Sequence, residues 1–201
     1  MVGESTVEET SDCLGVSVDI VVHELVENGF AARDVPEFGL PETDYGKALD
    51  HLVQANVDVI VHTAEQNVLL GYRQELPLRG MLWAFGGRMK LGESVTDAAG
   101  RALARELGFK NADPARFALD NIYNVIWGSR SIPPEERGFQ TLLILMRYEC
   151  TEPEIPNLNA ADETHEWVRW YTPAQIRELH VTGSWLIHPF LPVVLKNAGL
   201  L

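Results

Sequence analysis

The sequence predicts an α/β (α+β) fold in which helices flank a central β-sheet, preceded by an N-terminal extension. Segments rich in β-forming residues alternate with amphipathic segments of helical period along most of the chain. The 201 residues are 46% hydrophobic and 22% charged, a balance typical of a globular protein with a sizeable core. The Pro- and Gly-rich stretch 36–41 favours a boundary, with an acidic extension over 1–40 and one domain over 41–201.

The extension and the start of the domain carry weak signals. We expect residues 1–12 to be disordered and residues 16–26 to form one ordered element, either a strand or a helix. Thr43 and Asp44 then predict the start of a helix, and its apolar stripe ends before Asn56. The stripe consists of Ala48, Leu49, Leu52 and Val53.

Strands follow this first helix. The apolar runs 57–61 and 68–73 flank the polar residues 64–67, a pattern that predicts a β-hairpin. Residues 81–85 predict a further short strand, which ends at a pair of glycines. Residues 94–107 predict a helix, because a serine suited to N-capping begins the segment and a glycine follows it.

The C-terminal half again mixes the two kinds of element. Residues 117–127 and 139–149 predict two long strands, and residues 167–171 a final short one. A Thr-Pro pair opens a helix over 172–179, since Thr caps well and Pro suits the first helical position. Residues 189–198 form a last amphipathic segment.

Charge and hydropathy exclude several classes of protein. There are 29 acidic and 16 basic side chains, giving a formal net charge of −13, whereas nucleic-acid binding needs a basic face. The longest apolar runs, such as 142–146, fall far short of the roughly 20 residues that span a bilayer. The acidic start also lacks the basic region of a signal peptide. We therefore expect a cytoplasmic protein with a small-molecule partner, without nucleic-acid or membrane partners.

One stretch carries a chemical signal. The double glycine Gly86-Gly87 leads through a short loop into the helix predicted over 94–107. Six residues fall at the spacing of the Nudix box, so the sequence resembles the Nudix hydrolase family. They are Gly87, Glu93, Arg101, Leu103, Glu106 and Gly108. Carboxylates one turn apart on such a helix share a face, where hard oxygen ligands can hold Mg²⁺ or Mn²⁺ against a diphosphate.

The sequence departs from the box at two metal-related positions. Ala102 and Arg105 stand where the family has Glu, so Glu106 alone remains of the usual three carboxylates. Two alternatives follow: the site binds a single ion with help from elsewhere, or it no longer binds metal.

This reduced box is similar to that of the GDP-mannose mannosyl hydrolase branch of the family, and the resemblance covers roughly residues 50–175. It implies an α/β/α sandwich with a mixed β-sheet. It also implies divalent-metal-dependent hydrolysis of a nucleoside diphosphate sugar, with GDP-mannose or GDP-glucose as the leading substrate. In that branch water attacks the glycosyl carbon, which releases the sugar and the nucleoside diphosphate.

The resemblance assigns roles to individual residues. Glu106 and the backbone carbonyl of Gly86 would ligate Mg²⁺ or Mn²⁺, together with Thr164, which stands where the branch has a Gln ligand. His165 would be the general base, and Asp58 would support the site of the departing group.

Two arginines and four residues of the box complete the assignment. Arg73 and Arg88 would bind the diphosphate and take part in catalysis. The structural residues of the box would be Gly87, Glu93, Arg101 and Gly108, with Glu93 and Arg101 paired across the loop.

Each assignment has a plainer interpretation. A lone His is more often a surface or hydrogen-bonded residue, and Glu163 and Glu166 beside His165 are expected to raise its pKa. Arg73 and Arg88 could be ordinary charges at strand ends.

Two other functions stay open. One is Nudix attack at phosphorus of a related diphosphate, and the other is a non-catalytic domain that binds a nucleotide sugar and regulates a partner. We also expect a homodimer. The extension could cover a dimer interface, exchange between subunits, or shield the pocket.

Overall fold

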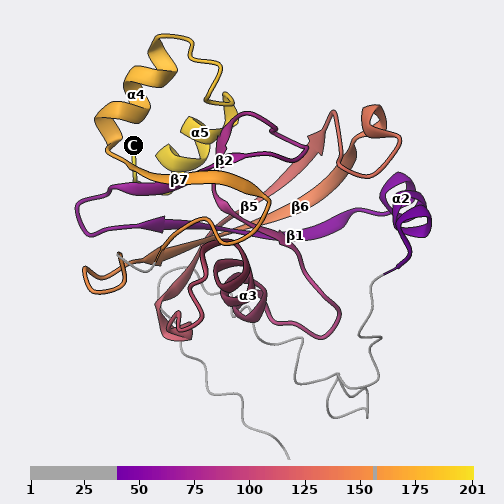
Figure 1. The fold of residues 1–201 in the computed structure, drawn as a ribbon, viewed down its shortest axis with the longest axis horizontal. Helices are drawn as coiled ribbons and strands as arrows, with labels where there is room; N and C mark the ends of the chain where they lie inside the picture. Colours follow the sequence, from indigo (N-terminus) through magenta and orange to yellow (C-terminus); the bar gives the residue numbers. More distant parts are fainter. Residues whose placement is uncertain (1–39, 156–157) are drawn as a thin grey trace, which may run out of the picture.

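The computed structural model describes residues 40–155 and 158–201 of the chain (Figure 1). The disorder expected over 1–12 and the element expected over 16–26 therefore lie outside the described residues. Within the described part, no helix is long and apolar enough to span a membrane.

The centre of the fold is β1 (Gln54–His62), which pairs with three other strands of one seven-stranded sheet. β6 (Phe139–Glu149) runs parallel to β1, whereas β2 (Val68–Arg73) and β4 (Phe85–Arg88) run antiparallel to it. The sheet is therefore mixed, as predicted. Further out, β3 (Leu82–Trp83) and β7 (His165–Tyr171) pair with β2, and β5 (Phe117–Trp127) pairs with β6.

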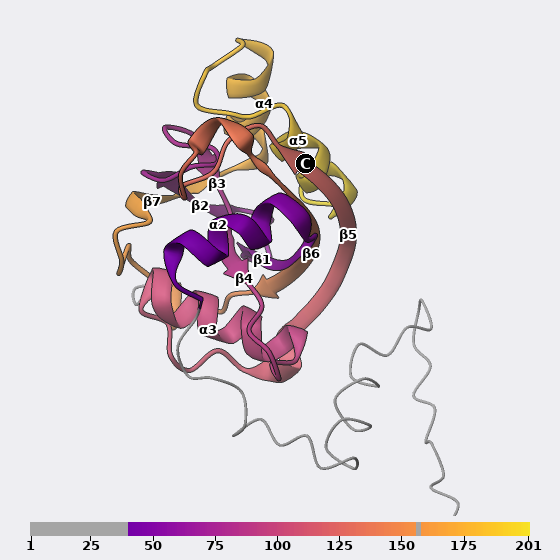
Figure 2. The ribbon, with the colours of Figure 1, turned by 90° about the vertical axis from the view of Figure 1, so that its right-hand side faces the viewer.

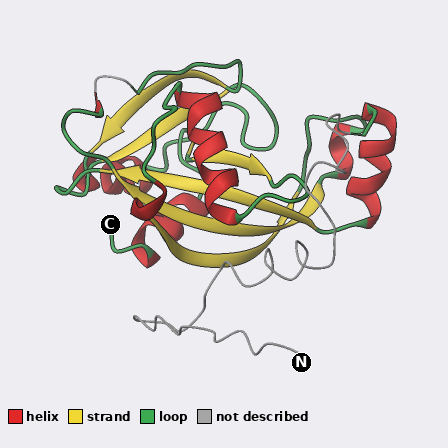
Figure 3. Cartoon of the chain, turned by 90° about the horizontal axis from the view of Figure 1, so that it is seen from below, coloured by secondary structure: helices red, strands yellow, loops and turns green. Residues whose placement is uncertain are grey.

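Helices cover both faces of this sheet. α3 (Val95–Leu107) crosses one face, as Figure 3 shows, and α4 (Pro173–Val181) and α5 (Phe190–Asn197) lie over the other. These three layers confirm the α/β/α sandwich. α2 (Glu42–His51) lies beside one end of the sheet (Figure 2), and 3-10 turns at Pro114–Arg116 and Glu135–Arg137 precede β5 and β6.

The apolar core forms two clusters, one on each face of the sheet. Val57 and Val59 of β1 pack on the α3 side, and Ile60 packs on the side of α4 and α5. Successive side chains of a strand point to opposite faces, so a strand covered on both sides must be apolar throughout. This explains why the predicted strand over 57–61 is an unbroken apolar run apart from its one acid, Asp58.

Several element boundaries differ from prediction. α2 ends at His51, and Leu52 adopts an extended conformation that leads directly into β1, so Leu52 and Val53 do not join the buried stripe and are 61% and 56% exposed. The predicted strand 81–85 is two short strands, the second of which contains both glycines. β7 begins at His165 instead of residue 167, because its pairing with β2 continues to Arg73.

α3 begins and ends where its capping residues predict. The Ser94 hydroxyl accepts a hydrogen bond from the Asp97 N–H at 3.1 Å, and the Asp97 carboxylate accepts one from the Ser94 N–H at 3.3 Å. This reciprocal arrangement is a capping box. Gly108 ends the helix in the left-handed region, with φ of 68°, where a residue without Cβ is favoured.

A buried arginine attaches α2 to the sheet domain. Arg130, on the loop after β5, is 1% exposed, and its Nη1 lies 2.7 Å from Oδ1 of Asp50 on α2. Its Nε donates to the carbonyl of Ile132 at 2.9 Å, and Arg137 reaches the second carboxylate oxygen of Asp50 at 2.6 Å. A buried charge is tolerated when it is paired and hydrogen-bonded in this way.

A second polar cluster fixes the loop after β6. The Glu154 carboxylate accepts hydrogen bonds from Arg116 at 2.8 Å, from the Tyr148 hydroxyl at 3.0 Å and from the Thr151 N–H at 2.7 Å. Burial opposes ionisation of Glu154, but the hydrogen bonds from Thr151, Arg116 and Tyr148 outweigh it and lower its pKa to about 2. Glu154 is therefore ionised throughout the physiological range.

We predict that Glu154→Gln destabilises the fold in a pH-dependent manner. The folded-state pKa lies below the ordinary value of 4.5, so this stabilisation is present above that value and is lost as pH falls toward 2. At pH 7 the variant should lose about 1.5–3 kcal/mol in the free energy of unfolding, the range for hydrogen bonds to a charged group. Urea unfolding from pH 7 to pH 2.5 measures this, and a difference from wild type that stays constant with pH would contradict the assignment.

Candidate active site

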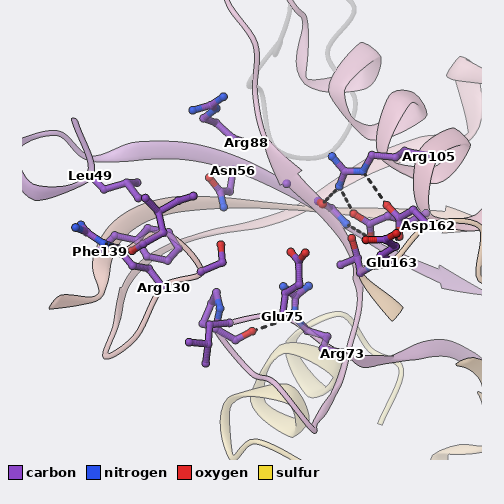
Figure 4. Close-up of a pocket in the computed structure, with 18 of the residues that line it drawn as sticks. Leu49, Asn56, Arg73, Glu75, Arg88, Arg105, Arg130, Phe139, Asp162 and Glu163 are labelled. Carbon is purple, nitrogen blue, oxygen red and sulfur yellow. Dashed lines mark hydrogen bonds and ion pairs between the residues drawn. The ribbon is translucent and has the colours of Figure 1, made fainter. Parts of the chain in front are cut away.

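A cavity of about 540 Å³ lies beside β4 and the C-terminal half of α3, a size suited to a small organic ligand. Its walls come from α2, from the ends of strands and from loops after β2, β5 and β6 (Figure 4). Charged side chains are balanced in it, with four bases and four acids: Arg73, Arg88, Arg105, Arg130, Glu75, Glu106, Asp162 and Glu163.

The loop between β4 and α3 is fixed by Glu93. Its carboxylate accepts a hydrogen bond from the Lys90 N–H at 2.7 Å and forms an ion pair with Arg101. Arg101 Nη2 also donates to the carbonyl of Arg88 at 3.0 Å. Burial opposes ionisation of Glu93, but the bonds from Arg101 and Lys90 prevail and lower its pKa. The charged pair thus ties α3 to the end of β4.

Gly86 allows β4 to approach its neighbours closely. A Cβ at this position would lie 2.1 Å from Oδ1 of Asp58 and 2.4 Å from the carbonyl oxygen of Val57, which no side chain permits. Its N–H donates to Oε2 of Glu106 at 3.1 Å. Glycine here therefore lets a backbone amide meet a carboxylate from α3.

The Glu106 side chain is fully buried, yet it belongs to the cavity wall. Burial raises its pKa to about 7, and the adjacent Arg105 guanidinium limits the rise. Arg105 Nη2 contacts Glu106 Oε1 and donates to the carbonyl of Gly86 at 2.8 Å, while its Nε lies 3.3 Å from Asp162 Oδ2. Arg105, which stands where the family has Glu, thus binds the carbonyl oxygen of Gly86 and the carboxylate of Glu106.

His165 lies behind Glu106, with its Nδ1 3.7 Å from Glu106 Oε2. The residue is 3% exposed and packs edge-on against the Phe85 ring, and neither ring nitrogen has a hydrogen-bond partner. Gly71 on the neighbouring strand makes room for it, since a Cβ there would lie 2.2 Å from the imidazole. This packing places His165 inside the protein.

Burial of His165 corrects the expected direction of its pKa shift. Burial, together with the positive charge of Arg73, lowers the pKa of His165 to about 4. The prediction that Glu163 and Glu166 raise it is wrong, because both carboxylates are exposed and desolvation of the imidazolium prevails. His165 is therefore neutral at pH 7.

Asp58 is also buried, at the centre of β1. Its Oδ2 accepts a hydrogen bond from the Trp83 indole at 2.7 Å. Burial raises its pKa, although the Trp83 bond favours the ionised form. Neither Asp58 nor His165 is among the described residues that line the cavity, so both lie behind its wall.

The other predicted ligand-binding residues do line the cavity. Arg73 donates through Nε to the carbonyl of Pro77 at 3.0 Å, and Arg88 lies over the ring of Tyr45 at 4.1 Å. Thr164 follows a turn in which its N–H donates to Asp162 Oδ1 at 2.9 Å. The structure thus gathers predicted residues from four separate segments: Arg73, Gly86, Gly87, Arg88, Glu106 and Thr164.

Sequence reasoning missed part of the wall. Tyr45 and Leu49 come from α2. Arg130 comes from the loop after β5, and Phe139 is the first residue of β6. The Arg-over-Tyr contact and the Asp50 pairing depend on tertiary distances that no local pattern encodes. Asp162 lay within the acidic run next to His165, so its position was visible but its partner, Arg105, was not.

The donor set fits one small cation. The Gly86 carbonyl and Glu106 Oε1 both contact the same nitrogen, Arg105 Nη2, so two hard oxygens converge on one point. Across the described ranges 40–155 and 158–201, no three His, Cys, Asp or Glu side chains are grouped to hold a metal. The arrangement therefore suits a single ion with further ligands from substrate or water, and not a cluster of ions.

The fold and the site together define a class of protein. It is an α/β/α sandwich in which β4, the strand with the double glycine, leads through a loop held by the Glu93–Arg101 ion pair into α3, the helix that carries Glu106. The family model for the NUDIX domain matches residues 52–191, and the chain belongs to this family. Nudix hydrolases typically use divalent metals.

Comparison with individual proteins gives more distant likenesses. The chain is 32% identical over 75 residues to the low-salt glycan biosynthesis protein Agl8 of Haloferax volcanii, a match covering 37% of this chain and 47% of that protein. The matched region thus spans about half the length of that relative.

Two solved structures share the fold. A NUDIX hydrolase from Nitrosomonas europaea is 18% identical, with a TM-score of 0.51, over 74% of this chain and 89% of that one. A bifunctional NMN adenylyltransferase/ADP ribose pyrophosphatase from Francisella tularensis, complexed with AMP and a Mn ion, is 19% identical. Its TM-score is also 0.51, over 90% of this chain and 48% of that one.

Proposed function

We propose that the protein hydrolyses a nucleoside diphosphate sugar, of the GDP-mannose or GDP-glucose type, at the glycosyl carbon. The products are the free sugar and the nucleoside diphosphate. The observation that carries this proposal is the cavity where several arginines surround the single carboxylate that α3 supplies. The glycan-related name of the Haloferax volcanii relative supports a substrate that contains a sugar.

Diphosphate binding is assigned to Arg73 and Arg88. Both side chains line the cavity, and in the sequence Arg73 precedes and Arg88 follows Gly86. Guanidinium groups match phosphate oxygens in geometry and charge. The ring of Tyr45 holds Arg88 at the wall through a cation–π contact. A departing diphosphate at this place would find its negative charge compensated by fixed cations.

Attack at carbon fits the small number of acids on α3. Several ions that activate water at phosphorus need several carboxylates as ligands. Among the described residues, the only carboxylate that α3 contributes to the cavity is that of Glu106. A glycosyl transfer to water needs only a leaving group whose charge is neutralised and a base for the water. Mg²⁺ or Mn²⁺, held by Glu106, the Gly86 carbonyl and Thr164, would supply part of that neutralisation when bound.

His165 is our assignment for the general base. Its ring is neutral at pH 7, and both nitrogens are free to accept or donate. Its contact with Glu106 Oε2 places it one carboxylate away from the cavity, so the two residues form a proton-accepting pair. Asp58 supports this assembly from β1, directly beneath Gly86.

A second candidate function is a non-catalytic domain that binds a nucleotide sugar and regulates a partner. Arg105 favours it, because its guanidinium already contacts both oxygens assigned to the metal. The absence of turnover with retained nucleotide binding would select this function.

We predict that the purified protein releases sugar from a nucleotide sugar in H₂¹⁸O. GDP-mannose, GDP-glucose, UDP-glucose and ADP-ribose are incubated with Mg²⁺, and products are analysed by mass spectrometry. Label in the free sugar, with unlabelled GDP, is the expected result because water attacks carbon. Label in a phosphate would transfer the mechanism to phosphorus, and binding without turnover would favour the regulatory function.

We further predict that His165→Ala slows turnover by roughly 10²–10⁴-fold, the range for loss of a general base. Glu106→Gln should remove most metal-dependent turnover. Glu166→Gln is the matched control, because Glu166 is exposed on the same strand and should keep the wild-type rate. Steady-state kinetics, with circular dichroism to verify folding, gives the answer. Wild-type rates in either site variant would remove that residue from the mechanism.

A homodimer is the final part of the proposal. Ile122 and Ile126 of β5 and Leu142 of β6 share one face of the sheet by strand register, and Ile126 is 77% exposed. A second copy of the chain would bury these three apolar side chains. One chain has a mass of 22.4 kDa, and light scattering should give twice this mass for the wild type. The variant Ile126→Glu should be a monomer. A wild-type monomer at high concentration would refute the dimer.

A further inference from the structure

Arg105 has an unusual place for a surface arginine of a helix. Its guanidinium turns back over the end of β4, where Nη2 donates to the Gly86 carbonyl at 2.8 Å and contacts Glu106 Oε1. On its other side, Nε pairs with Asp162 Oδ2 at 3.3 Å. Figure 4 shows this side chain pointing toward Asp162 and the acidic end of the cavity. One cation is thus held by three oxygens from three segments.

Two of these three oxygens are the ones that converge on the candidate metal position. A divalent ion binds protein oxygens at about 2.0–2.6 Å, so it would need the space that Nη2 occupies. The two positive charges would also repel each other at such a short distance. The guanidinium and the metal are therefore alternative occupants of one position.

Arg105 is the partner that can move. Its side chain is 45% exposed, whereas that of Glu106 is 0% exposed and fixed by the Gly86 N–H. Gly87 flanks the guanidinium, and even a Cβ there would lie only 3.3 Å from Nη2. The arginine is also half-exposed on the cavity side, and polar contacts to Gly86, Glu106 and Asp162 hold its guanidinium in place.

A diphosphate in the cavity would offer Arg105 a better partner than a carbonyl. Its oxygens carry full negative charge and accept bidentate guanidinium bonds. Movement of Arg105 onto the diphosphate would expose Glu106 Oε1 and the Gly86 carbonyl to an incoming ion, and the diphosphate would add further oxygen ligands to that ion.

We propose that Arg105 is a resident cation at the metal position of the free protein, so that a divalent ion binds tightly only together with a nucleoside diphosphate. This order of binding rests on the proposed nucleotide substrate. The occupancy of the position by Arg105 does not, because it concerns the ligand-free protein alone.

The test measures Mn²⁺ binding by electron paramagnetic resonance, with and without GDP. Wild type should bind Mn²⁺ weakly alone and at least tenfold more tightly with GDP. Arg105→Gln should bind Mn²⁺ alone at least tenfold more tightly than wild type, and its further gain from GDP should be smaller than that of wild type, because only the oxygen ligands of the diphosphate then contribute to it. Arg177→Gln on α4 is the matched control, since it removes one exposed helical arginine outside the cavity and should behave as wild type.

Additional variants keep the result decisive. Arg105→Gln with Glu106→Gln should lose the gained Mn²⁺ affinity, which locates the ion at this site. Arg105→Met, which also removes the positive charge, serves if the glutamine variant fails to fold, and should likewise bind Mn²⁺ alone at least tenfold more tightly than wild type.

Two outcomes would overturn the proposal: equal Mn²⁺ affinity of wild type and Arg105→Gln without GDP, or no Mn²⁺ binding by either protein. Failure of GDP to bind, measured separately by calorimetry, would count against the proposed function. The Mn²⁺ affinities of wild type and Arg105→Gln, measured without GDP, would still show whether Arg105 occupies the metal position.

Discussion

The contact between Glu106 and the Gly86 N–H is the interaction on which the site depends. It joins α3 to β4 at a point where only glycine fits over Asp58 of the central strand. A carboxylate buried this deeply is stable only with compensating partners, and Arg105 and the backbone amide provide them. The Glu93–Arg101 pair and the caps of α3 then fix the helix so that this contact is retained.

Burial shifts the two central titrating groups in opposite directions. The pKa of Glu106 rises to about 7 and that of His165 falls to about 4, since desolvation disfavours the charged form of each. Both groups therefore have neutral forms accessible near pH 7, while the arginines around them stay charged. The cavity therefore combines four guanidinium groups with a buried carboxylate, Glu106, whose protonation changes near neutral pH.

Local sequence determined much of this. Ser94 and Gly108 mark the ends of α3, and the spacing of the box brought Gly86 and Glu106 together correctly. The burial of His165 could not be predicted, because it depends on the register that sets Gly71 of β2 beneath β7. Arg130 meets Asp50 across 80 residues, and Arg105 looked only like a missing ligand until its side chain could be traced to Gly86. The types of helices and strands could be predicted from the sequence, but the distant partners of its charged residues could not.

The attachment of α2 separates two tasks within one cavity. α2 contributes Tyr45 and Leu49 to the wall, yet it ends at His51, just before the region that matches the family begins. The segment is joined to the domain chiefly through Asp50 and the buried Arg130. This part of the wall can change without altering β4, which carries the double glycine, or α3, which carries Glu106. Substitutions in α2 should therefore change the shape of the cavity while the contact between Glu106 and Gly86 is retained.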